Sequence, residues 1–280
     1  MKFGICTFNT QYSIPATELG PALEERGFES LWLAEHTHIP AARLSPWPGG
    51  PELPQMYYDT LDPFVSLASA AATTKTLRLG TGIALAIQRD PIQLAKEVSS
   101  LDVISNGRFS LGIGGGWNLE EMAHHGTDPS TRFRRLRETV EAMQALWSNE
   151  IAEYHGQLID FAPSYQNPKP IQKPHPPIHV GGSFPGVIKR VVSYSDGWMP
   201  IWGRGTENFT EQLSALDDAL VAAGRKRADI EISIYLAPMD TTEISKLKDL
   251  GVDRVIFGLP SVASDEALPV IDSIQQLMQH

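Results

Sequence analysis

The chain has 280 residues, 42% of them hydrophobic, which is enough for one large core or two smaller domains, and we expect one domain over residues 1–280. Its 23 basic and 33 acidic residues give a net charge of −10, so nucleic acid is not an expected partner. A single cysteine, Cys6, excludes an internal disulfide and is expected to be a buried core residue. Without a signal peptide or an apolar stretch of ~20 residues, the chain is predicted to be cytoplasmic and to span no membrane.

Short apolar runs alternate with helical patterns through most of the chain. The first half predicts, in order, strand 2–8, helix 16–26, strand 30–33, helix 63–74, strand 77–82, helix 91–105, strand 108–112 and helix 131–147. The second half predicts strand 178–180, helix 186–194, strand 197–199, helix 206–223, strand 230–235, helix 242–250, strand 254–257 and helix 264–279. The strands are mostly continuous apolar runs, as expected when both faces of a sheet are covered.

About eight strand–helix units in one chain predict a single (β/α)8 TIM barrel, with a doubly wound open sheet as the alternative. Loop insertions interrupt the alternation after the second and fourth strands. Residues 37–60 carry five prolines and no regular period, and such long irregular segments are usually functional or mobile. Residues 153–161 predict a small hairpin, and residues 162–177, with six prolines, predict an extended loop.

Glycines cluster at the predicted strand ends, where a barrel places its active site. The stretch 106–121 contains Gly112, Gly114, Gly115 and Gly116, and further glycines stand at 82 and at 181–182. Backbone this bare lets a flat or phosphorylated ligand lie on the amide groups, although a glycine-rich surface turn explains the 106–121 stretch equally well.

Few side chains at these strand ends are reactive. No lysine is present for a Schiff base, and Glu35 with His36 is too small a set for a metal, so we expect no metal site. The pairs His36 and His38, and His124 and His125, lack further ligands. The pattern therefore favours a planar cofactor that brings its own chemistry.

Four motifs carry a resemblance to a known family: Trp-Leu-Ala-Glu-His at 32–36, Leu-Gly-Thr-Gly-Ile at 79–83, the stretch 106–118, and Pro-Ile-His-Val-Gly-Gly at 177–182. In this order they resemble the luciferase-like monooxygenase superfamily, and within it the F420-dependent oxidoreductases more than the long FMN monooxygenases. The resemblance implies a (β/α)8 barrel that uses F420 or, alternatively, FMN. It also implies a non-prolyl cis peptide at Gly82-Ile83, bulging against the cofactor ring.

The remaining candidates have expected roles around such a cofactor. His36 is expected beside the reactive centre of the cofactor as a hydrogen-bonding or proton-moving group, with Glu35 orienting it. We expect the cofactor phosphate on Gly181, Gly182 and Ser183, where a helix begins. The bend formed by Gly114, Gly115, Gly116, Trp117 and Asn118 is expected near the ring rather than the phosphate, because Glu120 and Glu121 repel anions.

Three further groups of side chains can be interpreted from their positions in the sequence. The aromatic residues that can line a substrate pocket are Trp47, Tyr57, Tyr58, Trp117, Trp198 and Trp202, of which position favours Trp117 and Trp198. An anionic cofactor needs a local basic patch in so acidic a chain, and the candidates are Arg43, Lys189, Arg190 and Arg204. Arg132 to Arg137 are interpreted as an exposed, salt-bridged helix face.

The resulting hypothesis is hydride transfer between F420 and a small organic substrate whose identity the sequence does not define. The first alternative is an FMN-dependent monooxygenase that uses O2 and a partner reductase, and the second is a barrel that binds cofactor without catalysis. A homodimer is expected by analogy with the family. The loop 37–60 is expected to shape the substrate pocket.

Overall fold

The computed structural model describes residues 1–278, and within them eight parallel strands close into a barrel. Around the barrel the neighbours are β1, β10, β9, β8, β7, β4, β3 and β2, with β1 hydrogen-bonded to both β2 and β10. Their bounds are Lys2–Thr7 (β1), Ser30–Leu33 (β2), Arg78–Thr81 (β3), Phe109–Ile113 (β4), Ile178–Gly181 (β7), Gly197–Met199 (β8), Glu231–Tyr235 (β9) and Arg254–Gly258 (β10). The predicted TIM barrel is confirmed.

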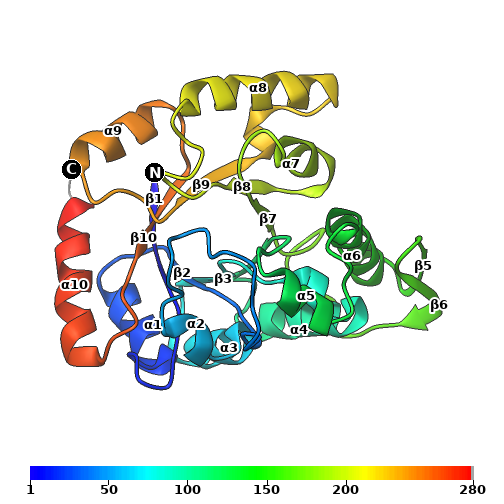
Figure 1. Cartoon of the computed structure of the whole chain (residues 1–280), viewed down its shortest axis with the longest axis horizontal. Helices are drawn as coiled ribbons and strands as arrows, with labels where there is room; N and C mark the ends of the chain where they lie inside the picture. Colours follow the sequence, from blue (N-terminus) through cyan, green and yellow to red (C-terminus); the bar gives the residue numbers. More distant parts are fainter. Residues whose placement is uncertain (279–280) are drawn as a thin grey trace.

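A helix follows each barrel strand and packs on the outside of the barrel (Figure 1). These helices are Ala16–Glu25 (α1), Pro63–Thr73 (α3), Pro91–Ile104 (α4), Arg132–Ser148 (α6), Ile188–Tyr194 (α7), Phe209–Ala222 (α8), Thr241–Asp249 (α9) and Ser264–Leu277 (α10). Three of them begin where an aspartate accepts backbone N–H groups of the first turn: Asp62 for α3, Asp90 for α4 and Asp240 for α9. The last predicted helix included Gln279, which lies outside the described residues.

The insertions contain more regular structure than the sequence predicted. The loop after β2 includes the short helix Met56–Asp59 (α2), and the insertion after β4 adds Leu119–His124 (α5). The hairpin is longer than expected, with strands Ile151–His155 (β5) and Asp160–Tyr165 (β6), and it lies at the edge of the molecule beyond α6 (Figure 1). Residues 162–165 therefore belong to a strand, not to the extended loop predicted for 162–177. Short 3-10 helices span Ala86–Gln88 and Arg227–Asp229.

Large side chains fill the inside of the barrel, and glycines on the neighbouring strands make room for them. A Cβ atom on Gly80 would lie 2.3 Å from the ring of Trp32, and one on Gly197 would lie 2.2 Å from the ring of His179. Above these rings Cys6, Met199 and Ile256 form a small buried cluster with Trp32. Burial raises the pKa of the Cys6 thiol to about 12, as expected for an inert core residue. The barrel is thus a packed core up to its mouth.

None of the helices within residues 1–278 combines the length and the apolar character needed to cross a bilayer.

Candidate active site

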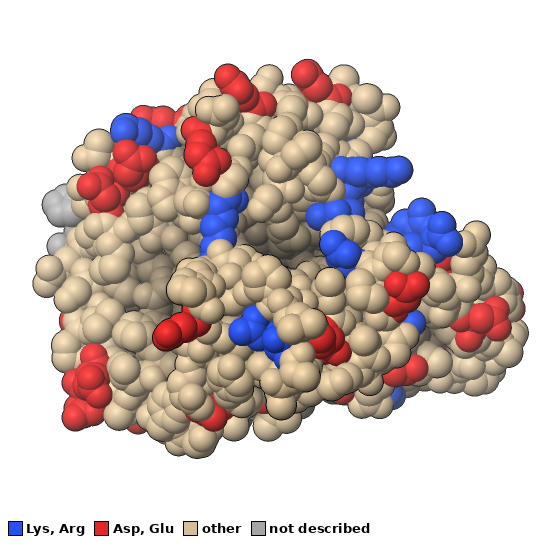
Figure 2. All heavy atoms as spheres, in the orientation of Figure 1, with Lys and Arg blue, Asp and Glu red and all other residues tan. Residues whose placement is uncertain are grey.

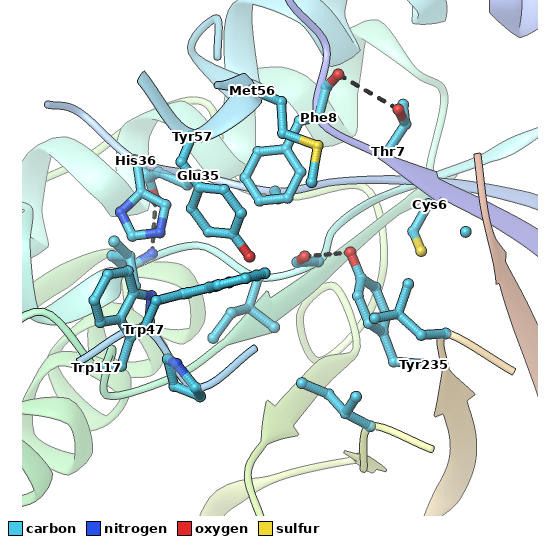
Figure 3. A pocket seen from close by; sticks show the side chains of 18 of the residues that line it. Cys6, Thr7, Phe8, Glu35, His36, Trp47, Met56, Tyr57, Trp117 and Tyr235 are labelled. Carbon is cyan, nitrogen blue, oxygen red and sulfur yellow. Dashed lines mark hydrogen bonds between the residues drawn. The ribbon is translucent and has the colours of Figure 1, made fainter. Parts of the chain in front are cut away.

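A cavity of about 490 Å³ opens at the carboxyl ends of the barrel strands (Figure 3). Its walls come from the ends of β1, β2, β3, β9 and β10 and from the loops that follow β2, β4 and β8. The lining is mostly apolar, and the volume suits a small-molecule site. Of the residues predicted for the site, the cavity is lined by Glu35, His36, Gly82, Ile83, Gly116 and Trp117.

His36 is held at the cavity wall by the carboxylate of Glu121, a residue that was expected only to repel anions. Its Nδ1 lies 2.8 Å from Oε2 of Glu121, and the side chains of His36 and Glu121 are 6% and 0% exposed. The other carboxylate oxygen of Glu121 accepts the backbone N–H of Thr37, at 3.3 Å. Asn118 caps α5 by accepting the N–H of Glu121, which directs this carboxylate inward. With Nδ1 engaged, Nε2 is the ring nitrogen left for chemistry.

The expected pairing of Glu35 with His36 is wrong. The Glu35 carboxylate accepts the backbone N–H of Leu85 at 2.7 Å and Nε of Arg89 at 2.8 Å. Arg89 also pairs with Asp62 and Glu97, so Glu35 is the buried member of an ion network at the edge of the cavity. Adjacent positions after a strand point to opposite sides, which explains why the two neighbours do not meet.

Ile83 forms part of the cavity wall and packs over the ends of two neighbouring strands. The Gly82–Ile83 peptide is cis, as the resemblance implied, and the Tyr235 hydroxyl donates to the Gly82 carbonyl oxygen at 2.6 Å. A Cβ on Gly114 would lie 2.0 Å from Cδ1 of Ile83, and one on Gly181 would lie 3.3 Å from its Cγ2. Both glycines therefore leave space for Ile83, which in turn faces the cavity.

The other candidate glycines have neighbours of their own. A Cβ on Gly115 would meet Phe133 at 2.8 Å, whereas Gly116 lines the cavity with φ +65°. Gly182, with φ +145°, leaves room for Arg190, whose Nη2 would lie 3.0 Å from an added Cβ. Ser183 is exposed, and its hydroxyl donates to the Arg204 carbonyl oxygen at 3.4 Å. The predicted helix start at residue 186 is also corrected, because a turn occupies 184–187 and α7 begins at Ile188.

Aromatic side chains from the loop 37–60 close one side of the cavity. His36, Trp47, Tyr57 and Trp117 lie together there (Figure 3), and the Tyr57 ring is centred 5.2 Å from that of His36. Burial raises the pKa of the Tyr57 phenol. Trp198, which position favoured, is fully buried in the core instead, where its Nε1 donates to the Gly182 carbonyl oxygen at 3.0 Å. The loop therefore supplies Trp47 and Tyr57 to the cavity, although position in the sequence had favoured Trp117 and Trp198.

Two buried hydrogen-bond donors near the glycine bends have no partner among the described residues. Within residues 1–278, Nδ2 of Asn118 and Nε of Arg190 are buried without a hydrogen-bond partner. Asn118 follows the Gly114–Trp117 bend, and Arg190 lies beside Gly182. The Glu120 carboxylate is turned away, since it accepts N–H groups of Leu44 and Ser45, and the Glu121 carboxylate is engaged by His36. These residues fit a flavin-type cofactor that carries a phosphate.

A (β/α)8 barrel with an apolar cavity and an acid–histidine pair at its mouth is the architecture of an enzyme. The chain belongs to the luciferase-like monooxygenase family, whose sequence pattern matches residues 1–243. This is a family of oxidoreductases and monooxygenases, and its members similar to this chain include both F420-dependent and flavin-dependent proteins.

Three relatives illustrate this range. An uncharacterized protein of Mycobacterium tuberculosis (strain ATCC 25618 / H37Rv) is 37% identical over 278 residues, 98% of this chain and 97% of that protein. An F420-dependent glucose-6-phosphate dehydrogenase of Kineococcus radiotolerans is 32% identical over 219 residues, 76% of this chain and 60% of that protein. The oxygenase component of a flavin-dependent trigonelline monooxygenase of Acinetobacter baylyi is 34% identical over 170 residues, 60% of this chain and 42% of that protein.

Solved structures share the fold. The monooxygenase RslO1 from Streptomyces bottropensis superposes with a TM-score of 0.80 at 22% identity, covering 100% of this chain and 99% of that one. The coenzyme F420-dependent tetrahydromethanopterin reductase from Methanopyrus kandleri gives a TM-score of 0.75 at 18% identity, covering 98% and 97%. At these identities the likeness concerns the barrel alone.

Proposed function

We propose that this protein is an oxidoreductase that moves a hydride between F420 and a small organic substrate, with His36 as the proton partner. The observation that carries the proposal is the buried His36–Glu121 pair at the wall of an otherwise apolar cavity bounded by Ile83. Few protein groups at this mouth are reactive, so the redox step must come from a bound cofactor. The F420-dependent relative that aligns with 76% of the chain favours F420.

Each part of the site has a role in this proposal. Gly82 and Ile83 would support the ring, the segment Gly114–Asn118 would lie along it, and Gly181, Gly182 and Ser183 would take the phosphate. When bound, F420 supplies a deazaflavin ring that accepts or gives up a hydride. The aromatic and aliphatic walls exclude water and orient an apolar substrate in front of it.

The protein's own chemistry in the proposal is proton transfer. Oxidation of an alcohol-type substrate to a carbonyl removes a hydride from carbon and a proton from oxygen, and Nε2 of His36 would take that proton. In the reverse direction the same nitrogen would return it. Glu121 would fix the ring tautomer through Nδ1 and balance a positive charge on the ring, so we regard it as a positioning residue.

The test is a titration of the purified protein with oxidised F420 and, separately, with FMN, followed by the change in cofactor absorbance and fluorescence. We expect F420 to bind in the micromolar range or tighter and FMN to bind more weakly. If neither cofactor binds below about 100 μM, the proposal is wrong.

An FMN-dependent monooxygenase is the second candidate, and the similarity to an oxygenase component of a flavin-dependent monooxygenase supports it. In that case a partner reductase would deliver reduced FMN, and O2 would be consumed. Oxygen uptake that requires reduced FMN and substrate, without turnover on F420, would establish this alternative. A cytoplasmic location, a single domain and a homodimer remain predictions.

A further inference from the structure

Basic side chains from two neighbouring helices gather beside the active-site mouth. Arg132, Arg134 and Arg137 project from α6, and Lys189 and Arg190 from α7, and we refer to these five residues as the α6–α7 basic cluster. A second cavity of about 330 Å³ lies between the two helices and is lined by four members of the cluster, with Phe133 and Tyr194. Figure 2 shows Lys and Arg side chains on both sides of the central hollow of this face, with more of them on the right.

Most members of the cluster have no carboxylate partner among the described residues. Across the described residues, Arg137 is the member that pairs with a carboxylate, Glu141, at 3.6 Å, and this pair is exposed. The interpretation of Arg132 to Arg137 as a salt-bridged face therefore holds for Arg137 and not for the rest of the segment. Nε of Arg132 and Nε of Arg190 are buried without a hydrogen-bond partner in residues 1–278. In a protein of net charge −10, such a cluster is expected to bind an anion.

The cluster is continuous with the glycines proposed to hold the cofactor. Arg190 and Arg132 stack on the Phe133 ring, with guanidinium carbons 4.1 Å and 4.6 Å from its centroid. Phe133 is the residue that a Cβ on Gly115 would meet, and Arg190 is the one closest to Gly182. A ligand whose phosphate rests at Gly181 and Gly182 would therefore extend directly between α6 and α7.

We propose that the α6–α7 basic cluster binds the oligoglutamate tail of F420. This inference rests on the proposed function and deepens it. The tail is a chain of carboxylates, and arginine and lysine side chains are the groups that bind successive carboxylates. FMN ends at its phosphate and has nothing to place in the second cavity. The cluster would thus favour F420 over FMN, and long tails over short ones.

The experiment compares dissociation constants for three ligands: the deazaflavin without phosphate or tail, F420 with a single glutamate, and F420 with several glutamates. We expect affinity to rise in that order and the gain from the longer tail to shrink as salt is raised. Arg134→Ala and Lys189→Ala should each weaken binding of the long-tailed F420 about two- to fivefold and leave the tail-free deazaflavin unaffected. Both residues are exposed, so folding should not suffer. Lys248→Ala, which removes an exposed charge on α9, is the matched control and should change nothing.

The outcomes separate this inference from the proposed function. If short-tailed and long-tailed F420 bind with equal affinity, or if Lys248→Ala weakens binding as much as the two cluster variants do, the cluster does not bind the tail. The proposal that the protein binds F420 would be unaffected by that result. No binding of any deazaflavin would overturn both. If the two variants bind F420 normally but lose activity driven by a reductase and reduced FMN, the cluster is a docking surface for that reductase, and the tail site is wrong.

Discussion

Nδ1 of His36 lies 2.8 Å from Oε2 of Glu121, 85 positions away in the sequence, and both side chains are shielded from solvent. The pair joins the end of β2 to α5, the short helix in the insertion after β4. Its imidazole faces the main cavity, whereas its carboxylate is fully enclosed. With Nδ1 engaged by Glu121, this geometry leaves Nε2 for the proton transfer that we propose.

Removing this ring should abolish turnover without abolishing cofactor binding. We expect His36→Ala to lower kcat by about 10²- to 10⁴-fold, the usual contribution of a general acid or base, with the dissociation constant for F420 changed little. Glu121→Gln, which keeps the size of the side chain, should lower kcat by at least about tenfold. Steady-state kinetics and cofactor titration on each variant provide the measurement. Glu120→Gln is the neighbouring control, and unchanged turnover in His36→Ala would instead favour a barrel without catalysis.

The ion network around Arg89 should contribute to stability rather than to chemistry. Arg89→Met leaves the buried carboxylate of Glu35 without its partner, and we expect the free energy of unfolding to fall by about 3–5 kcal/mol. Lys246→Met breaks a solvent-exposed pair with Glu243 and should cost less than about 1 kcal/mol. Urea denaturation of both variants tests this difference. If Arg89→Met lowers the free energy of unfolding only slightly but lowers kcat strongly, the catalytic role first expected for Glu35 would be supported instead.

The contact between Gly114 and Ile83 can be tested as a coupled pair. Gly114→Ala places a methyl group 2.0 Å from Cδ1 of Ile83 and should displace that side chain from the cavity wall, weakening cofactor binding. Ile83→Val removes Cδ1, so the double variant with Gly114→Ala and Ile83→Val should recover much of the lost affinity for the cofactor. A double-mutant cycle on the dissociation constant should give a coupling of about 1 kcal/mol or more. Strictly additive effects would show that the methyl group acts elsewhere.

Stability should fall on mild acidification because of His179. Burial lowers the pKa of this ring to about 4, against about 6.5 in an unfolded chain. Below about pH 6.5 the unfolded state binds a proton that the folded state does not take up until about pH 4, so unfolding becomes easier throughout this window. From this ring alone we expect the unfolding free energy to be about 2 kcal/mol lower at pH 5 than at pH 7.

His179→Gln should reduce that pH dependence, while His124→Gln, at an exposed site, should leave it intact. Denaturant titrations at the two pH values give the comparison. Glu231 acts in a separate, more acidic window: despite its burial, Arg254 and His179 lower its pKa to about 2, so its contribution is lost only below about pH 4.5. An identical loss between pH 7 and pH 5 in the wild type and in His179→Gln would contradict the assignment.

The sequence predicted the barrel because its signals are local. Apolar runs, an aspartate with proline at the start of α3 and of α4, and glycine at turns each depend on neighbours a few residues away. His36 and the Gly82–Ile83 bulge were found through motifs that remain contiguous in the chain. The role of Glu121 was not predicted because its partner, His36, is 85 positions away in the sequence. From its charge alone Glu121 is expected to repel an anion, whereas in the fold it forms a hydrogen bond with His36.

The glycines show a second limit of sequence reasoning. Gly114 and Gly181 were interpreted as space for a ligand, but each is first of all space for Ile83. Likewise, Arg132 to Arg137 looked self-neutralised because Glu138 and Glu141 follow them, yet the Glu138 carboxylate accepts N–H groups of Leu158 and Ile159 instead. Which atoms fill a space, and which charges remain unmatched, depends on residues from other elements.

The hydrogen bond from Tyr235 to the Gly82 carbonyl oxygen spans the barrel from β9 to β3. A cut in the chain between β6 and β7 would leave four barrel strands in each fragment, with the hydroxyl on one fragment and the carbonyl on the other. Neither fragment would then hold a finished cavity, and any activity of the mixture would report reassembly of the two pieces. Restoring this hydrogen bond therefore requires that the two halves of the barrel associate.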